Sequence, residues 1–148
     1  NNKSDFNKNT DLLLYMAARS ENIDLIKNSY KKKIILIDRF TDSTIAYQHY
    51  GMGVSINLIK TLNKYLLNNI KVDFTFLNIV NRNNLYERLK KRKSLNRYDR
   101  FNMTFYNKVQ NGFIKLSKLK RNKYKLINSN LEIKKNEKLI LNIIEKLI

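Results

Sequence analysis

The sequence has 148 residues, 43% of them hydrophobic, so it can bury a core and is predicted to form one domain over residues 1–148. It has no cysteine, a single histidine and no apolar run long enough to cross a bilayer, which excludes disulfides and thiolate metal sites and predicts a cytoplasmic protein without membrane contact. The net charge of +18 would suit a polyanion, but the lysines are scattered along the chain and proline is absent, as drift in an AT-rich genome would produce.

The pattern of apolar residues predicts helices that alternate with strands. A period near 3.6 residues predicts a helix from Asp11 to about Lys31, with Thr10 as its N-cap. A continuous apolar run predicts a strand over residues 33–38, buried on both faces of a parallel sheet. The elements predicted after it are helices over 41–50 and 54–69, a strand over 72–80, a helix over 83–92, a charged connector over 93–100, a helix over 101–119, a strand over 123–128 and a helix over 134–148. This alternation predicts an α/β fold with a parallel sheet flanked by helices.

Two charged residues, Asp38 and Arg39, follow the predicted strand over 33–38. In α/β proteins the carboxyl ends of parallel strands are where ligands bind. An arginine there can bind a phosphate through two charge-assisted hydrogen bonds, and a carboxylate beside it can orient a metal-bound water or another arginine. An ordinary ion pair that closes a strand would explain the same two residues.

Two sets of side chains on the neighbouring helices are suited to a nucleotide. Thr44, Tyr47 and Gln48 share one helix face, where an amide can pair with a base edge and a tyrosine can sense an added hydroxyl. Tyr15 and Arg19 form an i, i+4 pair that offers a ring for stacking and a guanidinium for a phosphate. Each set, taken alone, is also compatible with an exposed helix surface.

A third cluster, Arg92, Arg97 and Arg100, lies in the charged connector. Arginines on a mobile loop can surround a migrating phosphoryl group, which predicts a lid over about 92–100. A solvated, lysine-rich loop is the alternative. His49, without a second histidine nearby, is assigned no catalytic role and is predicted to be a surface or turn residue.

One stretch of the sequence resembles the signature of thymidylate kinases. It consists of Asp38-Arg39-Phe40, then Ser43, then Ala46-Tyr47-Gln48. Segments 14–19, 73–77, 87–101 and 105–113 are similar to the family's preceding helix, next strand, lid and following helix, in the same order and spacing. The resemblance to the bacterial form therefore covers nearly the whole chain.

The resemblance implies roles for most of these residues. Arg19 and Arg39 would bind the monophosphate, Tyr15 would stack on thymine, Thr44 and Gln48 would contact the base, and Tyr47 would lie against the deoxyribose. Arg92, Arg97 or Arg100 would neutralise charge on the transferred group, and Asp38 is predicted to be a catalytic residue together with them. No residue of this chain is predicted to be a direct metal ligand.

The sequence departs from the family pattern at three points. Phe40 replaces the usual tyrosine or histidine, and Asn102 stands where glutamate is common. The third departure is that no Gly-x-x-x-x-Gly-Lys-Ser/Thr motif, the loop that holds the donor phosphates, occurs in the 148 residues. We therefore expect a P-loop-kinase-like fold without its first strand, P-loop and first helix, and a chain that by itself is a poor or inactive kinase.

The function implied by the resemblance is phosphoryl transfer from ATP to dTMP, giving dTDP, with Mg²⁺ and ATP required and a homodimer expected. One alternative is another nucleoside-monophosphate kinase or a deoxynucleoside kinase of the same architecture. The other is a basic nucleic-acid-binding module, which the charge of +18 and the nine tyrosines would favour. Under the kinase hypothesis no nucleic-acid partner is expected.

Overall fold

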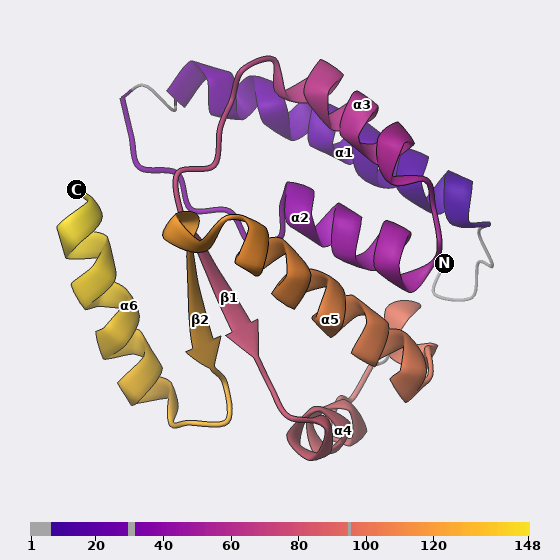
Figure 1. Cartoon of the computed structure of the whole chain (residues 1–148), viewed down its shortest axis with the longest axis vertical. Coiled ribbons are helices and arrows are strands. Elements are labelled where there is room, and N and C mark those ends of the chain that lie inside the picture. Colours follow the sequence, from indigo (N-terminus) through magenta and orange to yellow (C-terminus); the bar gives the residue numbers. More distant parts are fainter. Residues whose placement is uncertain (1–6, 30–31, 95) are drawn as a thin grey trace. The chain divides into compact units, whose positions relative to one another are not determined.

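The structure is a computed structural model that describes residues 7–29, 32–94 and 96–148, and it has an α/β fold (Figure 1). Its elements are α1 (Lys8–Ser29), α2 (Thr41–Thr44), η1 (Ile45–Gly51), α3 (Ile56–Leu67), β1 (Thr75–Ile79), α4 (Arg82–Lys90), η2 (Tyr98–Arg100), α5 (Met103–Leu119), η3 (Arg121–Lys123), β2 (Tyr124–Asn128) and α6 (Ile133–Leu147). They form two compact units. The first unit contains the chain up to Val72 together with Phe101–Leu116, and the second contains Asp73–Arg100 and Ser117–Ile148.

The core of the first unit lies between α1 and α3, which run side by side (Figure 1). Leu12 and Met16 of α1 pack there against Val54 and Ile59, and all four side chains are buried. Ser55 caps the N-terminus of α3, because its hydroxyl accepts a hydrogen bond from the backbone N–H of Leu58. The predicted helix over 54–69 is therefore confirmed with slightly shorter bounds.

The predicted helix from Asp11 to about Lys31 is confirmed as α1, but it begins three residues earlier. Its N-cap is Asn7, whose side-chain oxygen accepts hydrogen bonds from the backbone N–H groups of Asn9 and Thr10 at 2.9 and 3.0 Å. The prediction that Thr10 is the N-cap is wrong. An asparagine is the stronger cap where both are available, and Thr10 is tolerated one turn further in.

The predicted helix over 41–50 is confirmed, but most of it is wound as a π-helix. The short α2 leads directly into η1, and wide helical turns of this kind occur often at functional sites. Two glycines bring η1 close to α5 (Figure 1). A Cβ added to Gly51 would lie 2.6 Å from the Phe105 ring, and one added to Gly112 would lie 2.5 Å from the Tyr50 ring.

No strand forms over residues 33–38, so that prediction is wrong. Residues 34–37 have no regular secondary structure, and the apolar side chains of Ile34, Leu36 and Ile37 are 64%, 80% and 44% exposed. A strand needs a neighbour to complete its hydrogen-bond ladder, and within the described residues the only strand pairing is β1 with β2. An apolar run by itself does not supply that neighbour.

The second unit is built on β1 and β2, which confirm the strands predicted over 72–80 and 123–128. They pair in parallel, with Leu77 opposite Leu126 and Asn78 opposite Ile127 (Figure 1). The helices predicted over 83–92 and 134–148 are present as α4 and α6. In the described residues of the connector, 93–94 and 96–100, the single turn η2 is the only regular element. In the described part of the chain, none of the helices combines the length and apolarity of a membrane span.

Candidate functional site

Arg39 occupies the junction between the irregular segment over 34–37 and helix α2. Its backbone φ is 63°, in the left-handed region that residues other than glycine seldom adopt. Such a conformation costs about 1–3 kcal/mol and persists where the surrounding structure enforces it, frequently at functional sites. Because the residue is exposed, this backbone carries its positive charge to the surface of the first unit.

Tyr47, in η1, contacts the side chain of Arg39. The guanidinium carbon lies 5.1 Å from the centre of the Tyr47 ring, and the guanidinium donates a hydrogen bond to the tyrosine. Burial alone would lower the pKa of Arg39. The hydrogen bond to Tyr47 and the electrostatic interactions with Tyr47, Asp38 and Tyr15 outweigh burial and raise the pKa above its ordinary value. Arg39 is therefore a fixed positive charge.

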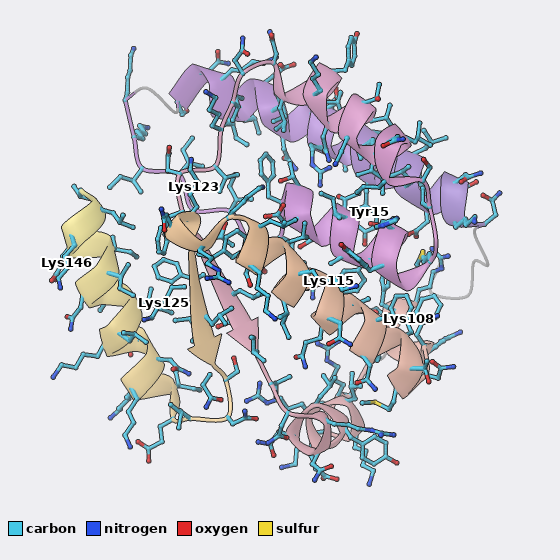
Figure 2. The ribbon with its side chains drawn as sticks, viewed as in Figure 1. Tyr15, Lys108, Lys115, Lys123, Lys125 and Lys146 are labelled. Atoms are coloured by element: carbon cyan, nitrogen blue, oxygen red, sulfur yellow. The ribbon has the colours of Figure 1, made fainter. Side chains whose placement is uncertain are left out.

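The rings around Arg39 differ in how far they are covered. Tyr47 is packed edge-on against Phe105 and Phe113 of α5, with ring centres 6.0 and 6.3 Å apart, so its position is fixed by the core of the first unit. Tyr15, labelled in Figure 2, comes from α1 and is 44% exposed. We call Tyr15, Asp38, Arg39 and Tyr47 the outer layer of the site.

Arg19, in contrast, is buried. It lies on the stripe of α1 that faces the core, in register with Met16 and Ile23, and is 8% exposed. Its Nη1 donates to the side-chain oxygen of Asn63 at 2.8 Å, and its Nη2 donates to the hydroxyl of Thr44 at 2.7 Å. Burial lowers the pKa of Arg19, because the charged form loses hydration.

Phe40 provides Arg19 with two further contacts. Its backbone carbonyl accepts a hydrogen bond from Nη2 at 3.2 Å, and its ring centre lies 5.4 Å from the guanidinium carbon. The aromatic ring at this position thus faces a buried cation, an interaction that does not need the hydroxyl or imidazole usual in the family. Both terminal nitrogens of Arg19 are consequently bonded to protein groups.

Gln48 is also buried and is hydrogen-bonded inside the first unit. Its amide nitrogen donates to the carboxylate of Asp11 at 2.8 Å, and the two residues are 1% and 3% exposed. We call Arg19, Thr44, Gln48, Asp11 and Asn63 the inner layer of the site.

Sequence reasoning missed two residues of this inner layer, Asp11 and Asn63. The available signal was position, because Asn63 stands four residues after buried Ile59, on the apolar face of its helix. A polar side chain on such a face needs a hydrogen-bond partner when the helix packs.

The six predicted acceptor residues, Tyr15, Arg19, Arg39, Thr44, Tyr47 and Gln48, all belong to the first unit, with Asp38 beside them. Within this unit the structure links Arg19 to Thr44, and Arg39 to Tyr47, Asp38 and Tyr15. A fixed surface guanidinium beside an exposed aromatic ring can bind a ligand that combines a phosphate with a flat, stacking group.

The three predicted lid arginines belong to the second unit. Arg92 donates to the carboxylate of Asp99 at 2.5 Å, and this carboxylate, with its side chain 4% exposed, also accepts from the backbone N–H of Asn96. Arg97 lies 6.0 Å from the Tyr98 ring centre, and Arg100 is exposed. The anion beside Arg92 is therefore an aspartate of the connector itself.

Two other residues singled out in the sequence have structural contacts. The His49 ring is hydrogen-bonded to the backbone carbonyl of Val54 at 2.8 Å, and the residue lies half-buried in the last turn of η1, not in a connecting turn or fully at the surface as predicted. Asn102 accepts a hydrogen bond from the backbone N–H of Phe105 at 2.9 Å and so caps α5. Within residues 7–29, 32–94 and 96–148, no cluster of three or more histidine, aspartate and glutamate side chains could hold a metal ion.

Comparisons with known proteins identify the family of the chain. The sequence profile of the thymidylate kinase family matches residues 1–140. A thymidylate kinase from Trichodesmium erythraeum (strain IMS101) is 40% identical over 111 residues, which are 74% of this chain and 49% of that protein. A second, from Thermosipho africanus (strain TCF52B), is 35% identical over 123 residues, 82% of this chain and 61% of that protein. The crystal structure of thymidylate kinase from Ehrlichia chaffeensis matches with a TM-score of 0.75 and 28% identity, covering 97% of this chain and 67% of the other.

The chain belongs to the thymidylate kinase family. It spans between half and two thirds of the length of the two curated relatives described.

Proposed function

We propose that the full-length protein transfers the terminal phosphoryl group of ATP to dTMP, giving dTDP. The observation that carries the proposal is Arg39, a fixed positive charge that a left-handed backbone and Tyr47 hold beside the exposed Tyr15 ring. In the reaction an oxygen of the dTMP phosphate forms a bond to the γ-phosphorus of ATP, and the bond from that phosphorus to the bridging oxygen breaks, releasing ADP. Positioning and charge neutralisation supply most of the catalysis in such a transfer.

The outer layer would bind most of the substrate. Arg39 would hold the monophosphate, Tyr15 would stack on thymine, and Tyr47 would lie against the deoxyribose and disfavour a 2′-hydroxyl. Asp38 would keep the Arg39 guanidinium oriented, in accord with its effect on the pKa of that arginine. These assignments place the phosphate at the exposed positive charge of the layer.

The inner layer would form the floor of the site. Thr44 and Gln48 would contact the base, and Arg19 would add positive charge beneath the nucleotide. In the structure the polar groups of all three are bonded to protein groups. Direct contact with the substrate would therefore require one of these bonds to be exchanged when dTMP binds.

Among the lid arginines, Arg100 is our first candidate for neutralising charge on the transferred group. Arg92 is bonded to the covered carboxylate of Asp99, whereas the Arg100 side chain is exposed. A loop arginine that must reach a nucleotide should not be held by a neighbour of opposite charge. The kcat values of Arg92→Ala, Arg97→Ala and Arg100→Ala, measured in the full-length protein, rank the three.

ATP and Mg²⁺ enter this proposal as one substrate, the magnesium complex of ATP. Within the described residues no group of three or more histidine, cysteine, aspartate and glutamate side chains could hold a metal ion, and the contact that we propose for Asp38 is with a metal-bound water. We derive no step from such a contact. We also propose that residues 1–148 belong to a single nucleoside-monophosphate-kinase-like domain, with the lid at about 92–100.

The test is the turnover of alternative acceptors by the full-length protein. ATP consumption is measured with dTMP, dUMP, dCMP and thymidine, and we expect dTMP to give the highest kcat/KM. A preference for dCMP or for the unphosphorylated nucleoside would contradict the proposal and favour a different kinase specificity. Binding to long single-stranded DNA that weakens steeply with salt, without dTMP turnover, would favour a nucleic-acid-binding module.

We further propose that the protein is a homodimer. The segment from Val54 to Asn69 carries apolar side chains that the first unit does not cover, among them Leu58 and Tyr65, which are 44% and 80% exposed. Exposed apolar groups on one helix favour association with another copy. Sedimentation at micromolar concentration is the test, and a monomer at every concentration would contradict this part of the proposal.

A further inference from the structure

Arg19 presents an unusual electrostatic arrangement, a buried guanidinium whose acceptors within the described residues are neutral. They are an amide oxygen of Asn63, a hydroxyl of Thr44, a backbone carbonyl of Phe40 and, as a weak acceptor at 3.4 Å from Nη1, the thioether sulfur of Met16. Burying a charge without a carboxylate is costly, as the lowered pKa of Arg19 also indicates. Short, well-directed hydrogen bonds to these neutral acceptors are therefore needed to offset the cost of burying the charge.

Asn63 fixes the Nη1 side of the Arg19 guanidinium. Its oxygen accepts from Nη1 of Arg19, whereas Nη2 donates to both Thr44 and Phe40. The guanidinium is planar and rigid, so an acceptor that fixes Nη1 also fixes the direction in which Nη2 points. Asn63 comes from α3, the oxygen partners of Nη2 come from the segment around α2, and the weak acceptor Met16 lies one turn away on α1.

The bonded path continues from Arg19 to the outer layer. The carbonyl that Nη2 holds belongs to Phe40, the residue directly after Arg39, whose backbone is in the left-handed region. A strained backbone is kept in place by contacts of its neighbours. Asn63 is in this way linked through Arg19 to Thr44 and to the backbone next to Arg39.

We propose that Asn63 is a positioning residue of the acceptor site. It orients Arg19, and through Arg19 it sets the positions of Thr44 and of the Arg39-Phe40 backbone. The inference rests on the proposed function, since it takes the acceptor to be dTMP. The competing explanation is that Asn63 only satisfies buried polar groups between α1 and α3, in which case its loss would change stability but not affinity.

Three variants of the full-length protein distinguish these explanations. Asn63→Leu keeps the approximate size and removes the acceptor, whereas Asn63→Asp keeps an oxygen within reach of Nη1. Asn57→Leu makes the same change at an exposed position of α3 and serves as the matched control. Isothermal titration calorimetry gives the Kd of dTMP and of thymidine for each, and urea denaturation gives the stability.

We expect Asn63→Leu to weaken binding of dTMP and of thymidine alike, by about tenfold or more, because a hydrogen bond to a charged group is lost. Asn63→Asp and Asn57→Leu should stay within about threefold of the wild type. NMR of the arginine side-chain nitrogens adds a measurement that does not depend on the stability of the fold, because it reports the rotation of the guanidinium. Separate Nη signals from Arg19 should persist in Asn63→Asp and merge in Asn63→Leu as the guanidinium begins to rotate.

Two negative outcomes are distinguishable. If the wild-type chain binds dTMP and Asn63→Leu binds it equally well, the positioning role is overturned and the proposed function stands. If the wild-type chain does not bind dTMP, the proposed acceptor site and this inference are both overturned. Should Asn63→Leu fail to fold, Asn63→Ser, whose hydroxyl is too short to reach Nη1, is judged by the same criteria.

Discussion

Replacing Arg39 separates the strain in its backbone from the charge of its side chain. At a φ of 63° a residue with a Cβ is strained by about 1–2 kcal/mol, which Arg39→Gly relieves. Glycine loses about 0.5–1 kcal/mol of that gain through its greater freedom in the unfolded chain. Arg39→Ala keeps the strain, and both variants lose the contact with the Tyr47 ring. We therefore expect the glycine variant to exceed the alanine variant in free energy of unfolding by roughly 0.5–1 kcal/mol.

Urea denaturation followed by circular dichroism measures this difference, and calorimetric titration with dTMP measures the function. Both variants should lose dTMP binding, because the phosphate loses its charge-assisted hydrogen bonds. Arg39→Lys is the matched control for charge. It keeps the positive charge without the planar fork, and we expect its Kd for dTMP to rise by about tenfold.

Two results would refute this reasoning. An alanine variant that is at least as stable as the glycine variant would show that the positive φ does not strain the backbone. A glycine variant that binds dTMP as tightly as the wild type would show that the side chain does not hold the phosphate.

The remaining predictions concern charge, packing and capping. Because the pKa of Arg39 is raised, the stability that its charge contributes is fully present below about pH 12 and is lost only above it. The difference in free energy of unfolding between wild type and Arg39→Ala should therefore be constant from about pH 6 to 9. Gly112→Ala should lower the free energy of unfolding by about 1–3 kcal/mol, because the new Cβ would meet the Tyr50 ring at 2.5 Å, whereas the same change at exposed Asn111 should not. Asn102→Ala should lower the free energy of unfolding by about 1 kcal/mol through loss of the α5 cap, whereas Asn102→Asp should leave it unchanged. Equal denaturation midpoints for the two variants would contradict the assignment of Asn102 as the cap.

Most elements of the fold follow from sequence periodicity, and the failures have a common cause. The helices α1, α3, α5 and α6 show their apolar stripes directly, because helical hydrogen bonds are internal to each segment. The strand predicted over 33–38 needed a partner that periodicity does not describe. The start of α1 at Lys8 depended on which of two polar residues, Asn7 or Thr10, caps the helix, and the wide turns of η1 leave no mark in the pattern.

The sequence predicted most of the residues that make up the candidate site, but not which of them are buried and which are exposed. Residue type and spacing identified Arg19, Arg39, Thr44 and Gln48, yet they did not show that the two arginines differ. Arg39 is exposed and its pKa is raised, whereas Arg19 is buried and its pKa is lowered. Arg19 is buried because its face of α1 packs against α3, whereas Arg39 lies before α2 and interacts with Tyr47, Asp38 and Tyr15, and both environments are tertiary properties.

The irregular segment over 34–37 has a consequence for the behaviour of the chain in solution. Its exposed isoleucine and leucine side chains are apolar and favour association between copies of the chain. The net charge of +18 opposes this association by electrostatic repulsion. Repulsion acts over about 10 Å at 0.1 M ionic strength but only about 3 Å at 1 M. Colloidal stability should therefore decline as salt is added, and a dilute buffer is the better medium for handling this protein.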